Sequence, residues 1–497
     1  MSIHTVGAAV LDIFSSSLYK TSWSIFREYI QNSCDAIDEA VKSGLLSEGE
    51  GVINVFIDKD NRKIVIEDNA TGIKADDFAK VLGSIAASGK DPSIHKGFIG
   101  IGRLIGLGCC KTVTFTAKSR DERIISKLTC EADLMRELLT GEKKFTVDDV
   151  LKQINKFSQE FTNDTESHYF IVELNEISSD HDYLLDLEGV KKSLAFVVPL
   201  PYSDNFSEFS TQIHEHAKEI GHKIDEYKIF LNEKQVFKPY NTIFPISGSD
   251  DDTIRQIQFW DIRDKNNNLF AWMWYGISSF KGVIKESCPM RGIRLRKENI
   301  QIGPDDILQK LFPEERGNHY FIGELFCVSK SLIPTTPRDY FVENGARLAL
   351  EKYLRTVFEN KLAKLYKIAS SIRSSLKKID ELDKIIDENQ MRLNEGLYHD
   401  DERKLQLEDE INKSESDIAK RKAVIDKYKS SSEIIKDIAE YVEIELNNSD
   451  KDYGKFTLTK YGKTVLNKAF GIILDELGTG TQTKQLIATI KEKLQYK

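Results

Sequence analysis

The chain has 497 residues, of which 40% are hydrophobic, 10% aromatic and 30% charged. This composition is typical of globular domains that bury a core, and it excludes a disordered or fibrous chain. The length leaves room for about three domains. The formal net charge is −9, so the field of the whole chain does not attract nucleic acid or an anionic membrane, and a nucleic-acid contact would need a local basic patch.

Six cysteines are scattered along the chain, without the spacing of a zinc site or of a disulfide framework. We therefore expect buried, reduced thiols. Residues 1–19 lack the basic and apolar regions of a secretory signal, and no run of about 18 apolar residues predicts a membrane span. These features predict a cytoplasmic protein with no membrane contact.

The chain changes character after Pro337, because all ten prolines lie at or before this position. Before it, strand-like runs at 52–57, 63–67, 112–117 and 169–174 alternate with helical stretches, which predicts an α+β region. The part after it is rich in Lys, Glu, Asp, Leu and Ile and is expected to be mostly helical.

In this tail, apolar residues recur every seven positions from Leu365 to Leu393 and again from Ile411 to Ile425. A polar stretch with Gly396 separates the two runs, so the pattern predicts an antiparallel coiled-coil hairpin with its tip near Gly396. Such an arm either grips a partner or serves as a spacer or dimer strut, and the sequence leaves both open. Residues 446–497 predict a small helical cap or dimerisation element.

The first of three polar motifs is FREYIQNSCDAIDEA at 26–40. On a helix, Glu28, Asn32 and Asp35 share one stripe of oxygen-bearing side chains. Taken alone, such a stripe is typical of a solvent-exposed helix face.

The second motif, KIVIEDNATGIK at 63–74, is a strand that ends at Asp68 before a turn containing Gly72. A carboxylate fixed at a strand end can accept a hydrogen bond from a buried amino group, such as the exocyclic amine of adenine. Taken alone, the motif is more typical of an ordinary Asx turn.

The third motif, GFIGIGRLIGLG at 97–108, places Gly97, Gly100 and Gly102 at the start of a helical stretch. Close-set glycines there let backbone N–H groups approach a polyphosphate. The motif lacks the Gly-Lys-Ser/Thr ending of a P-loop, and its place in the chain is not that of a Rossmann turn.

Together and in this order, the three motifs resemble the GHKL ATPase superfamily, which includes gyrase B, MutL, MORC proteins, sensor histidine kinases and the 90-kilodalton heat-shock chaperone. The segment VLGSIAASGK at 81–90 is also similar to the corresponding segment of that chaperone. The resemblance implies an N-terminal Bergerat-type ATP-binding α/β sandwich, with ATP and Mg²⁺ as cofactors.

The resemblance also implies roles for individual residues. Glu28 would be the general base that deprotonates the attacking water, and Asn32 would hold Mg²⁺. Asp68 would accept the adenine amine, with Gly72 closing the turn below the base. The other residues implied to bind the nucleotide, the glycines among them as a lid, are Asp35, Ile73, Ser88, Gly97, Gly100, Ile101 and Gly102. These roles suit phosphoryl transfer to water, which depends on positioning and charge neutralisation.

The chain departs from the family at Ala70, where members carry the first glycine of the turn. A Cβ is tolerated there only where the backbone does not need a positive φ. The geometry of the adenine pocket therefore depends on the backbone conformation of this residue.

Residues 291–306 and 324–341 resemble the strand and catalytic loop of the heat-shock chaperone's middle domain. By that match Arg338 is the loop arginine that reaches the γ-phosphate, where a guanidinium stabilises charge in the transition state. The alternative is a surface ion pair with Asp339. Arg294, Arg296 and Lys297 form the conspicuous basic cluster of the chain, which we expect to be a solvated edge rather than a phosphate or nucleic-acid contact.

The expected fold is therefore α+β in four parts. These are a GHKL ATP-binding domain at 1–179, an S5-like transducer or middle α/β domain at 180–344, a helical coiled-coil hairpin at 345–445, and a small helical element at 446–497.

The leading hypothesis for function is a slow, Mg²⁺-dependent ATPase that acts as a conformational switch. Two copies would close as a homodimer clamp on ATP and signal to a protein partner through the coiled coil, in a setting such as bacterial antiviral defence. The alternatives are a chaperone-like client binder, a MORC- or MutL-like nucleic-acid clamp, and a scaffold that binds nucleotide without hydrolysis. No TOPRIM-like acidic cluster or phosphoacceptor helix supports a gyrase or histidine kinase.

Overall fold

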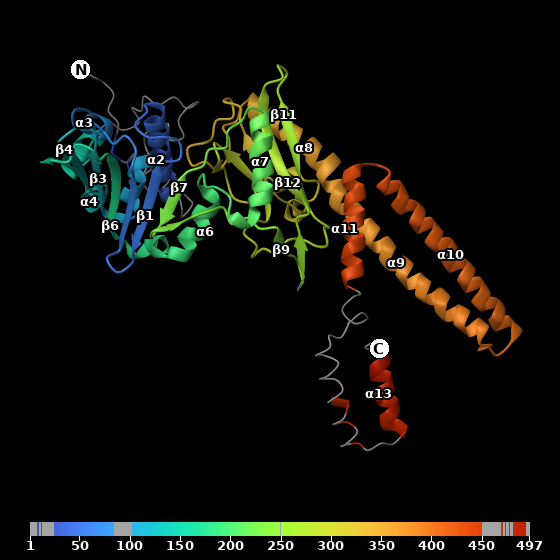
Figure 1. The fold of residues 1–497 in the computed structure, drawn as a ribbon. Coiled ribbons are helices and arrows are strands. Elements are labelled where there is room, and N and C mark those ends of the chain that lie inside the picture. Colours follow the sequence, from blue (N-terminus) through green and yellow to red (C-terminus); the bar gives the residue numbers. More distant parts are fainter. Residues whose placement is uncertain are drawn as a thin grey trace. The chain divides into compact units, whose positions relative to one another are not determined.

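The computed structural model describes residues 7–8, 11, 24–83, 102–248, 250–449, 469–470, 473, 477 and 481–493. Within these residues the chain is a mixed α+β structure with two large sheets and a set of long C-terminal helices, which confirms the expected fold class (Figure 1). The chain separates into two compact units, Met1–Gly276 with Val283–Glu359, and Ile277–Gly282 with Asn360–Lys497.

The first sheet of the larger unit has the strand order β5-β4-β3-β6-β2-β1-β7-β8. Its neighbouring strands pair antiparallel except for β1 and β7, which are parallel. The strands are β1 (Val52–Asp58), β2 (Lys63–Asp68), β3 (Cys110–Lys118), β4 (Ile124–Glu131), β5 (Asn155–Phe161), β6 (Tyr169–Ile177), β7 (Lys228–Leu231) and β8 (Lys234–Gln235). Residues of β1 and β2 alternate between buried and half-buried, as expected for strands that pack one face on helices.

Four helices accompany this sheet: α2 (Ser24–Lys42), α3 (Ala75–Gly83), α4 (Ala132–Thr140) and α5 (Val147–Ile154). Helix α2 packs against β1 and β2, and its buried apolar residues Phe26, Ile30, Cys34 and Ile37 recur at helical spacing. This packing fixes the opposite, polar side of α2, where the stripe predicted from the sequence lies.

The chain next forms α6 (Leu187–Val197) and α7 (Ser207–Glu219) and then returns to the first sheet as β7. Val52 pairs with Lys228 in this parallel addition. The first sheet therefore takes up residues beyond 179, and the segment that follows β8 leads directly into the second sheet. The two sheets are in this way joined through paired strands rather than by a free linker.

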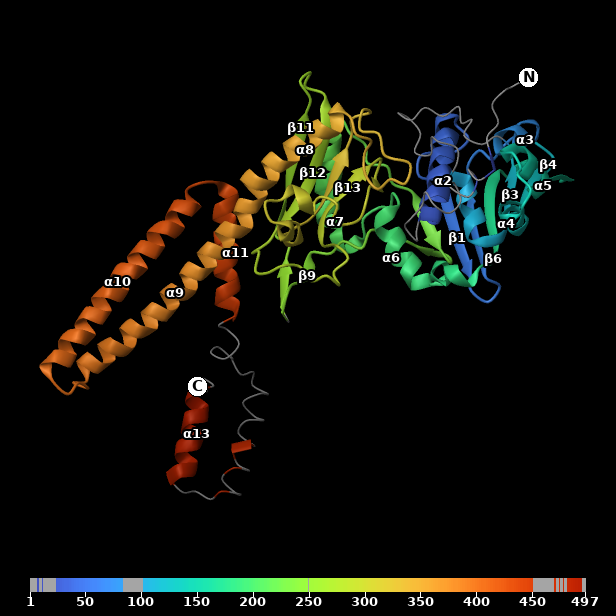
Figure 2. The same cartoon turned by 180° about the vertical axis from the view of Figure 1, so that it is seen from behind.

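The second sheet has the order β11-β12-β15-β13-β14, and a two-stranded ribbon of β9 and β10 lies outside it. The strands are β9 (Ile243–Pro245), β10 (Asp251–Thr253), β11 (Gln256–Arg263), β12 (Leu269–Ile277), β13 (Gly292–Lys297), β14 (Ile300–Gln301) and β15 (Ile322–Cys327). Every residue of β13 and β15 is buried, which places these strands in the centre of the layer. Helix α7 packs against β11 (Figure 2).

Short helical turns and one longer helix complete this unit. Helix α8 (Gly345–Val357) begins at Asn344, whose side chain accepts a hydrogen bond from the N–H of Arg347. The remaining turns are η2 (Gly102–Gly108), η3 (Ser179–Leu185), η4 (Asp204–Phe206), η5 (Gln309–Leu311), η6 (Glu315–Tyr320) and η7 (Phe358–Leu362).

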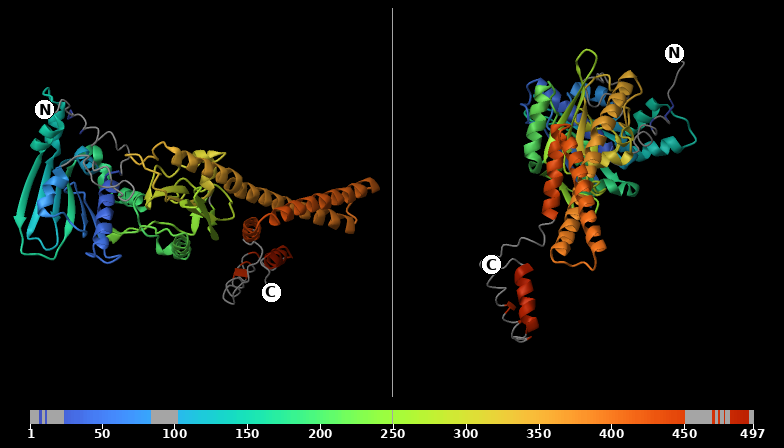
Figure 3. Two further views of the ribbon diagram at one scale, coloured as in Figure 1. Left: turned by 90° about the horizontal axis from the view of Figure 1, so that it is seen from above. Right: turned by 90° about the vertical axis from the view of Figure 1, so that its right-hand side faces the viewer.

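The smaller unit is built on α9 (Ala363–Asn394), α10 (Asp401–Lys429), α11 (Glu433–Ser449) and α13 (Thr481–Lys493). Helices α9 and α10 lie side by side as a hairpin, visible in two directions in Figure 3. Apolar residues form the seam between them. Ile379 and Ile386 on α9, and Ile411, Ile418 and Ile425 on α10, repeat every seven positions, and Leu382 lies between the first two. Gly396 adopts a φ of +67° between the two helices, as the predicted tip requires.

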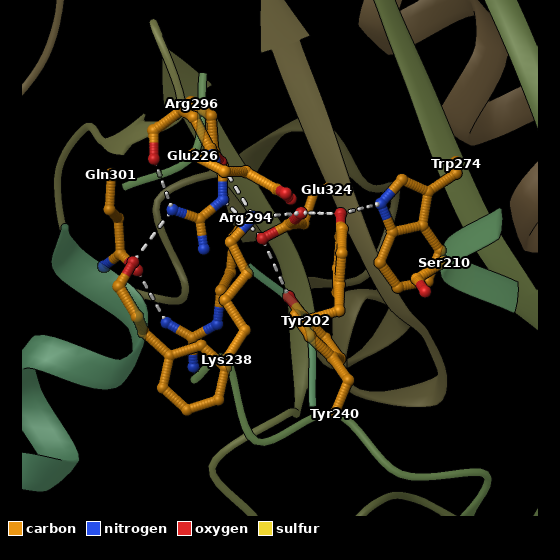
Figure 4. A network of polar contacts seen from close by, with 12 residues as sticks. Tyr202, Ser210, Glu226, Lys238, Tyr240, Trp274, Arg294, Arg296, Gln301 and Glu324 are labelled. Carbon is orange, nitrogen blue, oxygen red and sulfur yellow. Dashed lines mark hydrogen bonds and ion pairs between the residues drawn. The ribbon is translucent and has the colours of Figure 1, made fainter. Parts of the chain in front are cut away.

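The basic cluster on β13 is not the solvated edge expected from the sequence, and that expectation was wrong. Arg294, Arg296 and Lys297 expose only 4%, 0% and 8% of their surface. The buried Glu324 of β15 pairs with Arg296 and also accepts a hydrogen bond from Lys238 at 3.0 Å (Figure 4). Arg294 donates to Gln301 Oε1 at 2.8 Å, and Lys297 donates to the carbonyl oxygen of Ser329 at 2.9 Å. Whether a strand lies at the edge or in the centre of a sheet depends on its neighbouring strands, which the local sequence does not specify.

The described cysteines are all buried and free, as expected. No helix in the described part of the chain is both long and apolar enough to cross a membrane.

Candidate functional site

The polar stripe of α2 is covered rather than solvated. The side chain of Glu28 is 12% exposed and Asp35 is 7% exposed, while Asn32 is half-buried. Arg27 donates hydrogen bonds from Nη2 to Glu28 Oε1 and to the carbonyl oxygen of Pro337, both at 3.1 Å. A loop that follows the second sheet therefore lies against the helix that carries the predicted general base.

Asp68 ends β2 with only 1% of its surface exposed. Its Oδ1 accepts a hydrogen bond from the N–H of Ala70 at 3.1 Å, and the Ser33 side chain also bonds to the carboxylate. Burial outweighs these hydrogen bonds and raises the pKa of Asp68 to about 7. Because water does not solvate this buried carboxylate, a hydrogen bond from a ligand N–H stabilises it more than it would stabilise an exposed carboxylate.

The turn after Asp68 can be built only with glycine at position 72. Gly72 has a φ of +62°, and a Cβ there would lie 2.0 Å from the carbonyl oxygen of Lys118. Ala70 is fully buried and is not among the residues with positive φ, so its departure from the family glycine causes no backbone strain. The carbonyl oxygen of Ala70 lies 2.7 Å from His168 Nδ1, which holds the other side of the turn. Ile73 is half-buried and packs on the core.

The end of the glycine motif lies directly against the predicted general base. A Cβ on Gly102 would be 2.7 Å from Glu28 Oε2, so a larger residue at this position would displace the carboxylate of Glu28. Four residues later the N–H of Gly106 donates to the hydroxyl of Tyr29 at 3.2 Å, which fixes η2 to α2. The other residues predicted for this region lie outside the described residues, and they are Ser88, Gly97, Gly100 and Ile101.

Arg338 is the predicted residue that comes from furthest along the chain. It is 5% exposed, so it is not the surface residue of the alternative interpretation, and it adopts a φ of +54°. Its backbone is held by hydrogen bonds to Thr335 and from Gly303. Burial lowers the pKa of Arg338, and the charges of Glu28 and Asp35 oppose this effect. The fold thus brings the loop arginine together with two carboxylates of α2.

Arg27 is a site residue that the sequence analysis missed. The available signal was its position one residue before Glu28, together with the helical spacing of Arg27, Gln31 and Asp35, which places all three on one side of α2. The carbonyl of Pro337 that it binds could not be foreseen, because nothing in the local sequence pairs residues so far apart. Ser33 and His168, which support the Asp68 turn, were missed for the same reason.

The donor set fits the group that the resemblance implies. Among the described residues no cluster of three or more His, Cys, Asp or Glu side chains could hold a metal ion by itself. Mg²⁺ commonly takes one or two protein oxygens and completes its shell with water and substrate phosphates. The amide oxygen of Asn32, with Glu28 and Asp35 on the same helix, is compatible with such a site.

Comparison with known proteins agrees with this geometry. Residues 19–160 match the family model described as Histidine kinase-, DNA gyrase B-, and HSP90-like ATPase. This part of the chain is therefore similar to ATPase domains of the GHKL type. The chain is also similar to curated proteins named Chaperone protein HtpG.

The relative from Rickettsia typhi is 27% identical over 225 residues, which cover 41% of this chain and 33% of that protein. The relative from Alkalilimnicola ehrlichii is 41% identical over 86 residues, covering 16% and 13% of the two chains. The relative from an Enterobacter species is 29% identical over 161 residues, covering 29% and 25%. The matched part of this chain therefore spans a third or less of these relatives.

Proposed function

We propose that this chain is a Mg²⁺-dependent ATP hydrolase that uses ATP to change the contact between helix α2, which packs on the first sheet, and the loop that follows the second sheet. The observation that carries the proposal is the meeting of Glu28, Gly102 and Arg338, which come from a helix, a glycine motif and a distant loop. A general base, a close backbone approach and a cation are the parts that hydrolysis of a phosphoanhydride needs.

In the proposed reaction a water oxygen attacks the γ-phosphorus, and the bond to the bridging oxygen of ADP breaks. Glu28 accepts the proton of the attacking water, with Arg27 holding its Oε1 in place. Arg338 stabilises the charge on the γ-phosphate, and Asp68 accepts the N–H of the adenine amine. Asn32 would hold Mg²⁺, which when bound neutralises phosphate charge.

The same geometry supports a switch. Arg338 belongs to the loop after the second sheet, whereas Glu28 belongs to the helix of the first, so the state of the γ-phosphate can alter the contact between α2 and this loop. We further propose that the chain works as a homodimer and that the α9–α10 hairpin, with its long apolar seam, contacts a protein partner. The relatives from Rickettsia typhi and Enterobacter are bacterial proteins, which supports a bacterial setting; antiviral defence is the setting we propose to test.

A chaperone-like client binder is the second candidate, and the relatives named Chaperone protein HtpG favour it. It predicts that the protein suppresses aggregation of unfolded proteins, whereas a dedicated switch has one tight partner. The nucleic-acid clamp loses its support, because the basic cluster of Arg294, Arg296 and Lys297 is buried.

The test is ATP turnover with Mg²⁺ in the wild type and in Glu28→Ala, with oligomeric mass followed in the same samples. Glu28→Ala is expected to bind ATP without turnover and to accumulate as an ATP-bound dimer. Glu39→Ala is the matched control, because Glu39 is an exposed acid of the same helix and should leave turnover unchanged. Equal turnover in wild type and Glu28→Ala would refute the catalytic role of Glu28.

A further inference from the structure

Gln31 of α2 has a buried amide that makes no hydrogen bond within the described part of the chain. It exposes 1% of its surface, and among the described residues neither its Nε2 nor its Oε1 has a hydrogen-bond partner. An unpaired buried amide costs stability, and an apolar side chain would occupy the same space without that cost. An uncompensated polar group in a folded domain therefore calls for a role in another state of the molecule.

The position of Gln31 on the helix indicates what it faces. It follows Arg27 by four residues and precedes Asp35 by four residues, so the three side chains share one side of α2. Arg27 donates to the carbonyl oxygen of Pro337, and Asp35 interacts electrostatically with Arg338. Gln31 is thus flanked on both sides by residues that face the loop of Pro337 and Arg338.

That loop is itself held in an unfavourable conformation. Arg338 adopts a φ of +54°, a region that non-glycine residues seldom occupy, and such strain tends to persist where it is part of a mechanism. The loop and the helix face beneath it therefore each contain one unfavourable feature. A small movement of the loop could relieve both at the same time.

We propose that Gln31 is a positioning residue that captures the Pro337–Arg338 loop when ATP is bound, by forming hydrogen bonds that the nucleotide-free state lacks. This inference rests on the proposed ATPase function and extends it to a residue that does not touch the nucleotide. Because the hydrogen bonds form only when ATP is bound, they stabilise the closed state in which turnover occurs, and by linkage they also strengthen ATP binding.

The experiment compares wild type with Gln31→Met, a change that keeps an unbranched side chain of similar length and removes the amide. Gln31→Met is expected to raise the unfolding temperature, to lower kcat about tenfold and to weaken ATP binding. Gln31→Asn keeps an amide and should recover part of kcat. A merely structural role predicts higher stability with unchanged kcat, and that result would overturn the proposal.

Asn155→Leu is a matched control. The Oδ1 of Asn155 is also buried and has no hydrogen-bond partner among the described residues. Asn155 lies on the edge strand β5, however, whereas α2 packs against β1 and β2. This variant should leave kcat unchanged.

A second measurement follows hydrogen exchange of the backbone at 334–340 with a non-hydrolysable ATP analogue. Protection in wild type that is absent in Gln31→Met supports the proposal even if turnover is undetectable; equal behaviour of the two proteins refutes it. If the wild type shows no turnover, that result by itself counts against the ATPase function and not against the capture of the loop.

Discussion

The pKa of Asp68 predicts how nucleotide affinity depends on pH. Burial raises this pKa from 3.8 to about 7, and only the ionised carboxylate is a pure acceptor for the adenine amine. About nine-tenths of the carboxyl groups are ionised at about pH 8 and about one-tenth at about pH 6, so ADP affinity should fall roughly tenfold between these values. The assay is a calorimetric titration with ADP across this range.

Asp68→Asn is the control that separates the carboxyl from the phosphate of the ligand, which titrates in the same range. In this variant the remaining pH dependence comes from the nucleotide alone, and affinity at about pH 8 should be well below that of wild type. The pH dependence of folding stability has the opposite sign to that of ADP affinity. Because folding raises the pKa of an acid, the free energy of unfolding of wild type falls as pH rises from about 4 to about 7, and Asp68→Asn should unfold at higher temperature at about pH 8. Identical pH dependence of ADP binding in the two proteins would refute this reasoning.

Three further predictions concern other parts of the chain. Gly72→Ala should cost more than about 2 kcal/mol of stability and abolish nucleotide binding in a titration, because its Cβ would lie 2.0 Å from a backbone oxygen, whereas Ala70→Gly should bind almost normally. Glu324→Gln should lower the free energy of unfolding by about 3–5 kcal/mol in urea, since it leaves two buried cations unbalanced. The pKa of Glu324 is lowered from 4.5 to about 2, so wild type should lose this stabilisation as pH falls from about 4.5 towards 2, and the variant should lack that loss. Arg373→Met removes a buried pair with Glu445 at 2.7 Å and should lower the unfolding temperature of the helical unit while ADP affinity stays unchanged.

The parts of the candidate site that sequence reasoning predicted are those specified within short segments. The spacing of Glu28, Asn32 and Asp35 follows from one helix, and the turn from Asp68 to Gly72 follows from one strand and its end. Both depend on local geometry, which the residue pattern specifies. The same holds for the α9–α10 seam, because a seven-residue repeat requires a partner helix.

The parts that were missed or wrong depend on distant partners. The cluster around Arg296 is buried because Glu324 lies on the adjacent strand β15, and the charge pattern of β13 alone is equally compatible with an exposed edge. The bond from Arg27 to Pro337 and the return of β7 to the first sheet are likewise set by tertiary packing. Burial of a polar residue is a property of its neighbours, so a single segment does not predict it.

Glu28 of helix α2 and Arg338 of the loop that follows β15 are proposed to act in one site. The most direct measurement is a double-mutant cycle on single-turnover ATP hydrolysis with Glu28→Ala, Arg338→Ala and the double variant. Groups that act as a unit give non-additive losses, so the account predicts that the double variant is about as slow as the slower single variant, with ATP affinity retained. Losses that multiply, or full activity in Arg338→Ala, would contradict it.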